Sequence, residues 1–181
     1  MKIKNGINLY KYAKTLIPGG TTLFSKRSEL YLPNKWPAYF KKAKKINVWD
    51  LNGNKYLDMF CAVGTSILGY GNEKVNKSVL KNIDNGNMST LNCPEEVSLA
   101  KTIIKHHSWS SMAKFTRGGG EANALAIRIA RSFTKKKNVA FCGYHGWHDW
   151  YLSANINSKN NLDQHLMSGL NYDGIPESLK D

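Results

Sequence analysis

The sequence predicts an α/β fold in which helices pack against a mainly parallel sheet. Residues 112–116 are short and β-prone, residues 121–133 favour an amphipathic helix, and residues 139–142 form an unbroken apolar run. A strand, a helix and a second strand in this order form a right-handed crossover, which makes the two strands parallel. Two further helical patterns precede this unit, and with 41% hydrophobic residues the 181-residue chain can bury a core.

The N-terminal part combines a short helix with a β-hairpin. Apolar residues recur at helical spacing between residues 2 and 17, and Pro18 with the two glycines after it ends the pattern. In residues 39–59, Asn52 and Gly53 stand between two β-prone runs. This dipeptide suits the positive φ angles of a tight turn, so a hairpin is expected here.

Two helices are expected between the hairpin and the strand, helix and strand unit. Asn72 is a suitable N-cap and Gly86 a stop signal for the first, and Pro94 suits the first position of the second. Each pattern places apolar residues on one face, which we expect to be buried. These residues are Val75, Val79, Leu80 and Ile83 in the first helix, and Val97, Ala100, Ile103 and Ile104 in the second.

Charge and cysteine content exclude several classes of protein. The formal net charge is +13, but lysine carries it rather than arginine, and no nucleic-acid-binding motif accompanies it. Cys61, Cys93 and Cys142 are odd in number and widely spaced, which argues against a disulfide framework or a zinc site. No apolar run is long enough to span a membrane, and the first residues lack the apolar stretch of a signal peptide. We expect a cytoplasmic protein with no nucleic-acid or membrane partner.

Gly118, Gly119 and Gly120 lie between the first predicted strand and the helix that follows it. In open α/β sheets ligands bind at this carboxyl edge. Unhindered N–H groups and the positive end of the helix suit a phosphate there. A tight turn in which glycine only relieves strain is an equally good interpretation of the three residues by themselves.

The loop after the second predicted strand favours the phosphate interpretation. It carries Tyr144, His145, Trp147 and His148, which should emerge beside the glycines because parallel strands end at the same edge. A phosphate cradle next to aromatic rings is a pocket for a flat phosphorylated cofactor, and pyridoxal 5'-phosphate (PLP) has that shape. A metal site of His145, His148 and Asp149 is an alternative, although no helix places them on one face.

Five motifs stand in order between residues 9 and 157. They are "IPGGTTLFSKR", "VWDLNGNKYLDM", "MSTLNCPEEVSLAKTI", "GGGEANALAIRIAR" and "CGYHGWHDWYLSAN". In content and order they resemble class III PLP-dependent aminotransferases, particularly proteins similar to glutamate-1-semialdehyde 2,1-aminomutase. The resemblance implies a fold-type-I transferase of which this chain holds the N-terminal part. Residues 1–60, with the hairpin, are then part of a small domain, and residues 61–181 begin the large PLP-binding α/β domain.

The same resemblance implies a cofactor site. By the family's motif, Gly119 and Gly120 bind the PLP phosphate, Tyr144 lies against the pyridine ring, and His145 lies beside it. Gly118 is expected to belong to the same cofactor-binding site. It also implies a homodimer that acts on a small-molecule amino donor and a carbonyl acceptor. The family often has Ser-Gly-Thr where this chain has three glycines, so only backbone N–H donors remain, and "TTLFSKR" departs from the aminomutase's substrate-binding pattern.

The chemistry needs a lysine that forms a Schiff base with the cofactor's aldehyde and an acid that keeps the pyridine nitrogen protonated. In the family both lie well downstream of these motifs, whereas lysines of this chain stand in charged runs such as residues 41–45 and 135–137. We therefore expect a fragment, a truncated product or half of a split enzyme, inactive in isolation and without a catalytic lysine. A non-catalytic remnant of the fold or a basic binding protein is the alternative.

Overall fold

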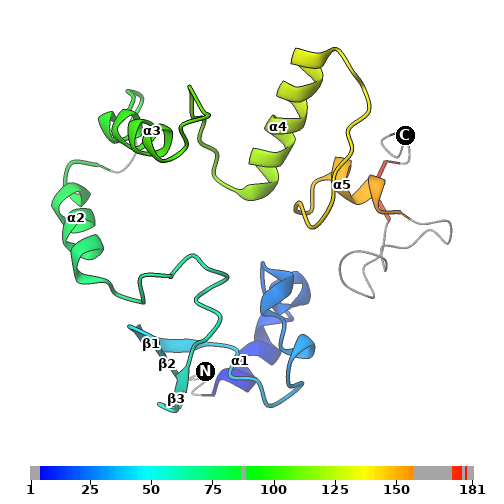
Figure 1. Cartoon of the computed structure of the whole chain (residues 1–181). Coiled ribbons are helices and arrows are strands. Elements are labelled where there is room, and N and C mark those ends of the chain that lie inside the picture. Colours follow the sequence, from blue (N-terminus) through cyan, green and yellow to red (C-terminus); the bar gives the residue numbers. More distant parts are fainter. Residues whose placement is uncertain (1–4, 87–88, 157–172, 177, 179–181) are drawn as a thin grey trace. The chain divides into compact units, whose positions relative to one another are not determined.

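A computed structural model describes residues 5–86, 89–156, 173–176 and 178. The chain divides into two compact units, Met1–Thr90 and Leu91–Asp181 (Figure 1). The first unit contains a helix, a small sheet and a second helix, and the second unit contains three helices joined by loops. The boundary between a small and a large domain, predicted at residue 60, is not tested by this division and stays a prediction.

The first unit begins with α1 (Gly6–Ala13), which confirms the short N-terminal helix. Asn5 caps it, since its side-chain oxygen accepts a hydrogen bond from the backbone N–H of Ile7 at 2.8 Å. The helix buries Tyr10 and Ala13. Three single 3₁₀ turns follow: Pro18–Gly20, Phe24–Lys26 and Ser28–Leu30.

Tyr10 fastens α1 to these turns. Its hydroxyl donates to Glu29 Oε2 at 2.8 Å and also lies 3.1 Å from the carbonyl oxygen of Gly19, and Lys14 forms an ion pair with the same carboxylate. Gly20 has a φ of +77°, and a Cβ on it would lie 2.9 Å from Tyr10 Cε2. The Pro-Gly-Gly turn therefore needs glycine at this position both for its conformation and for the space beneath the ring.

The carboxylate of Glu29 makes the first unit sensitive to acid. Lys14, followed by further hydrogen bonds, lowers the pKa of Glu29 from 4.5 to about 2. Because the folded state lowers this pKa, its contribution to stability is complete above pH 4.5 and is lost as the pH falls towards 2. We expect the unfolding midpoint of the first unit to fall across this window, as measured by denaturation at each pH. The Glu29→Gln variant should show a flatter dependence, and an equally steep one would contradict this assignment.

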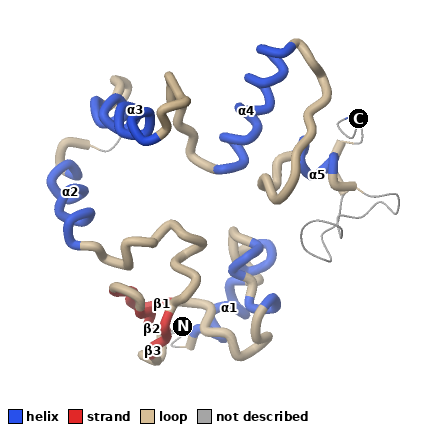
Figure 2. Tube along the Cα trace, in the orientation of Figure 1, coloured by secondary structure: helices blue, strands red, loops and turns tan. Residues whose placement is uncertain are grey.

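The sheet of the first unit is antiparallel, with strands in the order β1 (Phe40–Lys44), β2 (Asn47–Asp50) and β3 (Lys55–Leu57) (Figure 2). The predicted hairpin is confirmed as β2 and β3, and Gly53 in its turn has a φ of +90°. The carboxylate of Asp50 accepts the backbone N–H groups of Asn52 and Asn54, each at 2.9 Å, which closes the turn. Strand β1 is a third strand that the hairpin pattern did not predict.

A compact loop connects the sheet to the next helix. The Asp58 carboxylate accepts the hydroxyl of Tyr70 and the N–H of Phe60, the latter at 2.8 Å. The hydrogen bond from Tyr70 lowers the pKa of Asp58, and the same contact raises the pKa of Tyr70 to about 12. Inside this loop, Cys61, Ala62 and Val63 all adopt positive φ angles, so the chain makes a left-handed turn there.

Four more α-helices follow among the described residues, and the first three of them confirm the sequence pattern. They are α2 (Glu73–Ile83), α3 (Pro94–His106), α4 (Gly119–Thr134) and the short α5 (Asp149–Ala154). The side chain of Asn72 accepts the N–H groups of Lys74 and Val75 at 3.1 and 3.2 Å, as expected of an N-cap. Among the described residues, no helix is long and apolar enough to cross a membrane.

The expected burial of the apolar helix face is wrong for α2 and only partly met for α3. Val75, Val79, Leu80 and Ile83 of α2 are between 47% and 64% exposed. On α3, Val97 is 59% exposed, whereas Ala100, Ile103 and Ile104 are half-buried. Periodicity identifies the face that a helix turns towards a core, but it does not specify the neighbouring element that covers that face.

The two strands predicted around α4 are also wrong. Residues 112–116 and 139–142 are loop, and no backbone hydrogen bond joins them within the described ranges. β-Propensity measures how well a segment suits a pleated, half-buried surface, whereas a strand exists only when a neighbour completes its ladder. The helix between the two segments forms without that ladder.

Candidate functional site

The N-terminus of α4 has no side-chain cap at Gly118, and the Glu121 carboxylate of its first turn accepts the backbone N–H of Arg117 at 3.0 Å. Gly118 is its N-cap, with an extended φ of −150° and no side-chain cap, and the first helical hydrogen bond runs from Ala122 N to Gly118 O at 3.0 Å. Within the described contacts, the N–H groups of Gly119, Gly120 and Glu121 have no acceptor. Free N–H groups at the positive end of a helix are suited to bind an anion, so this end fits a phosphate.

The three glycines are not needed to relieve backbone strain. None of Gly118, Gly119 and Gly120 has a positive φ, so the tight-turn interpretation loses its support. A Cβ on Gly118 or Gly119 would meet nothing within 4 Å. The missing side chains therefore leave free space over the N–H groups of the helix.

The loop of residues 143–148, called the aromatic loop below, reaches the N-terminus of α4, as the sequence predicts. The side-chain amide of Asn123 on α4 donates to the carbonyl oxygen of His145 at 3.2 Å. Gly146 has a φ of +102°, and a Cβ on it would lie 3.2 Å from the Cα of Gly120. Two glycines thus permit the backbone of this loop to touch the first turn of α4, although the parallel strands expected to bring them together are not formed.

His148 lies against the last of the three glycines. A Cβ on Gly120 would lie 2.7 Å from both Cδ2 and Nε2 of the His148 ring. A real side chain at position 120 would have to displace the imidazole. The bare backbone of Gly120 is therefore a requirement of this contact.

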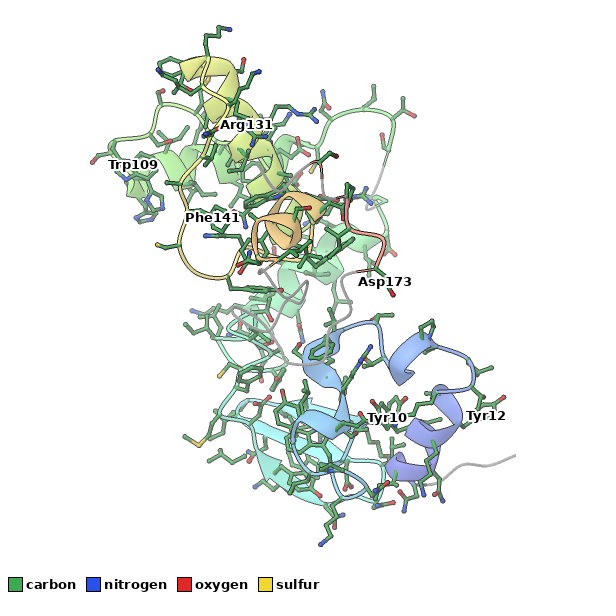
Figure 3. All side chains as sticks on the ribbon, turned by 90° about the vertical axis from the view of Figure 1, so that its right-hand side faces the viewer. Tyr10, Tyr12, Trp109, Arg131, Phe141 and Asp173 are labelled. Carbon is green, nitrogen blue, oxygen red and sulfur yellow. The ribbon has the colours of Figure 1, made fainter. Side chains whose placement is uncertain are left out.

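A cluster of aromatic rings packs against the aromatic loop. Tyr151 on α5 is fully buried, and its ring centroid lies between 5.6 and 5.8 Å from those of Phe141, Tyr144, His145 and Trp150. Figure 3 shows Phe141 beside α5. Burial raises the pKa of the Tyr151 hydroxyl, which donates to Gly143 O at 3.1 Å.

The two predicted ring-contacting residues differ in their surroundings. Tyr144 is 60% exposed and packs edge-on against Tyr151, which leaves much of its ring free for a ligand. A ring nitrogen of His145 lies 2.7 Å from Cys142 O, and its ring lies beside Trp150. His145 is thereby held by the chain itself, in a position next to Tyr144.

Sequence reasoning overlooked two residues of this site, Asn123 and Gly146. Asn123 is an unremarkable polar residue in a helical run, and only the folded loop reveals its acceptor. The glycine in "YHGWHD" was a better signal, because an isolated glycine in a loop of bulky rings often marks a positive φ or a close approach.

No group of three potential metal-binding side chains gathers among the described residues, so the alternative of a metal at His145, His148 and Asp149 lacks support. A hollow of about 650 Å³ lies towards the C-terminal end of α4, away from the glycines. Arg131 and Lys135–Lys137 line it, together with Phe141 and Trp150 of the aromatic cluster.

Comparison with known proteins places this geometry in a family. The chain is 34% identical over 155 residues to a 3-aminobutyryl-CoA aminotransferase of Cloacimonas acidaminovorans, covering 85% of this chain and 37% of that protein. It is 36% identical over 183 residues to the glutamate-1-semialdehyde 2,1-aminomutase of Wigglesworthia glossinidia brevipalpis, covering 98% and 40%. The chain therefore spans about two fifths of the length of these curated relatives.

Solved structures agree on the fold. The FumI protein of Sphingopyxis sp. MTA144, in its PLP form, matches with a TM-score of 0.75 and 27% identity over 81% of this chain and 35% of that protein. An omega-transaminase from Sphaerobacter thermophilus matches with a TM-score of 0.77 and 22% identity over 99% and 40%. These matches confirm the predicted fold-type-I architecture.

The family profile of class III aminotransferases matches residues 32–172, which include α2, α3, α4, the glycines and the aromatic loop. PLP is the cofactor of this family, in agreement with the N–H groups without a described acceptor at the start of α4. The chain belongs to the class III aminotransferase family.

Proposed function

We propose that this chain forms the PLP-binding part of an aminotransferase or aminomutase that acts on a small-molecule amino donor and a carbonyl acceptor. One observation carries the proposal: the uncapped N-terminus of α4 meets the aromatic loop at Gly120 and Gly146. An anion site and an exposed ring thus come from adjacent loops. This combination suits a ligand with a phosphate at one end and a flat ring at the other.

Each part of the site has a role in the proposal. The N–H groups of Gly119, Gly120 and Glu121 hold the phosphate, with Gly118 leaving the approach clear. Tyr144 lies against the ring, and His145 fixes the neighbouring loop by its contact with Cys142 O. PLP, when bound, supplies an electron sink for the carbon next to the substrate nitrogen.

In this proposal, the lysine that the reaction needs is none of Lys101, Lys105 and Lys135–Lys137 of the second unit. Lys135, Lys136 and Lys137 lie beyond the C-terminal end of α4, whose 16 residues span about 24 Å. Lys101 and Lys105 lie on the exposed surface of α3. We infer that the 181-residue chain binds the cofactor without performing transamination by itself.

Binding of PLP tests the proposal directly. We expect purified chain to bind PLP saturably and reversibly, with inorganic phosphate as a competitor, in an absorbance titration. Gly119→Asp places a carboxylate at the open helix end, where a Cβ has free space, so we expect it to weaken PLP binding about tenfold or more. Gly119→Asn is the uncharged control of matched shape. Absence of PLP binding by the wild-type chain would refute the proposed function.

A non-catalytic basic binding protein is the second candidate. The hollow at the far end of α4 favours it, because Arg131 and Lys135–Lys137 line it with positive charge. Such binding depends steeply on salt concentration.

We further propose that the aminotransferase or aminomutase is a cytoplasmic homodimer. The three free cysteines fit a reducing compartment.

A further inference from the structure

We propose that His148 binds the cofactor's phosphate together with the N-terminus of α4. This inference rests on the proposed function and extends it to a residue outside the five predicted site residues. The observation behind it is the position of the imidazole, whose Cδ2 and Nε2 occupy the space beside Gly120 where a side chain of residue 120 would begin. A donor in that position lies beside the free N–H groups of α4.

The imidazole of His148 is held in place without using its nitrogens. Its backbone carbonyl accepts the N–H groups of Tyr151 and Leu152 at 2.9 and 3.1 Å, which fixes the residue at the start of α5. Its ring packs edge-on against Trp147, with the centroids 4.8 Å apart. No described residue forms a hydrogen bond with either ring nitrogen, so a donor remains available to a ligand.

The glycines explain why such a donor is useful. They provide backbone N–H groups but no hydroxyl or charged side chain, and Gly118 offers no side-chain cap. A hydrogen bond from an imidazole to a phosphate is charge-assisted and stronger than a neutral one. His148 thus supplies the side-chain contact that the three glycines cannot make, and Gly120 provides the room for it.

Comparing PLP with pyridoxal, which lacks the phosphate, tests this role in the full 181-residue chain. We expect His148→Ala to weaken PLP binding about tenfold or more while leaving pyridoxal binding unchanged. His148→Gln, which keeps an N–H donor, should recover part of the loss. His106→Ala, at the exposed end of α3, is the control and should change neither affinity.

The outcomes separate this inference from the proposed function. If the wild-type chain binds no PLP, the proposed function itself is wrong. If it binds PLP and His148→Ala binds PLP equally well, or loses PLP and pyridoxal to the same extent, the phosphate role of His148 is overturned.

A double-mutant cycle provides an independent test. Gly120→Ala should weaken PLP binding by displacing the imidazole, and it should cost much less when His148 is already alanine. Additive losses would show that the two positions act separately, and would also overturn the inference.

Discussion

Replacing Gly146 with alanine is expected to weaken PLP binding about 30-fold or more. A φ of +102° strains any residue with a Cβ, at a cost of about 1–3 kcal/mol. The new methyl group would also lie 3.2 Å from the Cα of Gly120, a backbone atom that cannot rotate away. Both effects separate the aromatic loop from the N-terminus of α4. Titration of the variant with PLP, followed by absorbance, measures the loss.

Gly143→Ala is the matched control for this variant. Gly143 also has a positive φ, +84°, but a Cβ on it would meet nothing within 4 Å. It therefore carries the same kind of backbone strain without the contact at Gly120. We expect a clearly smaller loss of affinity for Gly143→Ala. Equal losses would assign the effect to strain alone and would contradict the role of the contact between the two loops.

Replacing Tyr151 with alanine is expected to destabilise the second unit by about 3–5 kcal/mol. The ring is fully buried and touches four other aromatic rings, so its removal leaves a cavity under the aromatic loop. Urea denaturation monitored by tryptophan fluorescence reports this loss, because Trp150 belongs to the cluster. Amide exchange in residues 142–154 should accelerate in parallel.

Tyr151→Phe separates packing from the hydroxyl group. It retains the ring and removes only the hydrogen bond to Gly143 O, whose net contribution is about 1 kcal/mol. We expect most of the stability to remain in this variant. If Tyr151→Phe unfolded as easily as Tyr151→Ala, the hydrogen bond rather than the aromatic packing would be the main support of the loop.

Local signals accounted for α1 to α4 and for the turn of the hairpin. Asn72 caps α2 and Pro94 begins α3, because these residues satisfy or avoid the unpaired N–H groups of a first turn within a few residues of chain. Asn52 and Gly53 form the turn between β2 and β3 for the same reason of local conformation. Such features depend on neighbours in sequence, and a sequence pattern contains them completely.

Features that depend on distant neighbours were less accessible. The apolar run at residues 139–142 has the composition of a strand, but a ladder needs a partner that composition does not specify. The contacts of Gly146 with Gly120 and of Asn123 with His145 join a loop to the start of α4, more than twenty positions away in the sequence. The sequence predicted that the aromatic loop lies beside the three glycines, whereas the atoms in contact are known only from the folded structure.

The exposed apolar face of α2 has a consequence for the colloidal behaviour of the chain. Exposed apolar surface of this kind favours association in solution, while a formal net charge of +13 makes every pair of copies repel. The repulsion acts over a Debye length of about 10 Å at 0.1 M salt and about 3 Å at 1 M. We therefore expect raised ionic strength to favour association of copies of this chain.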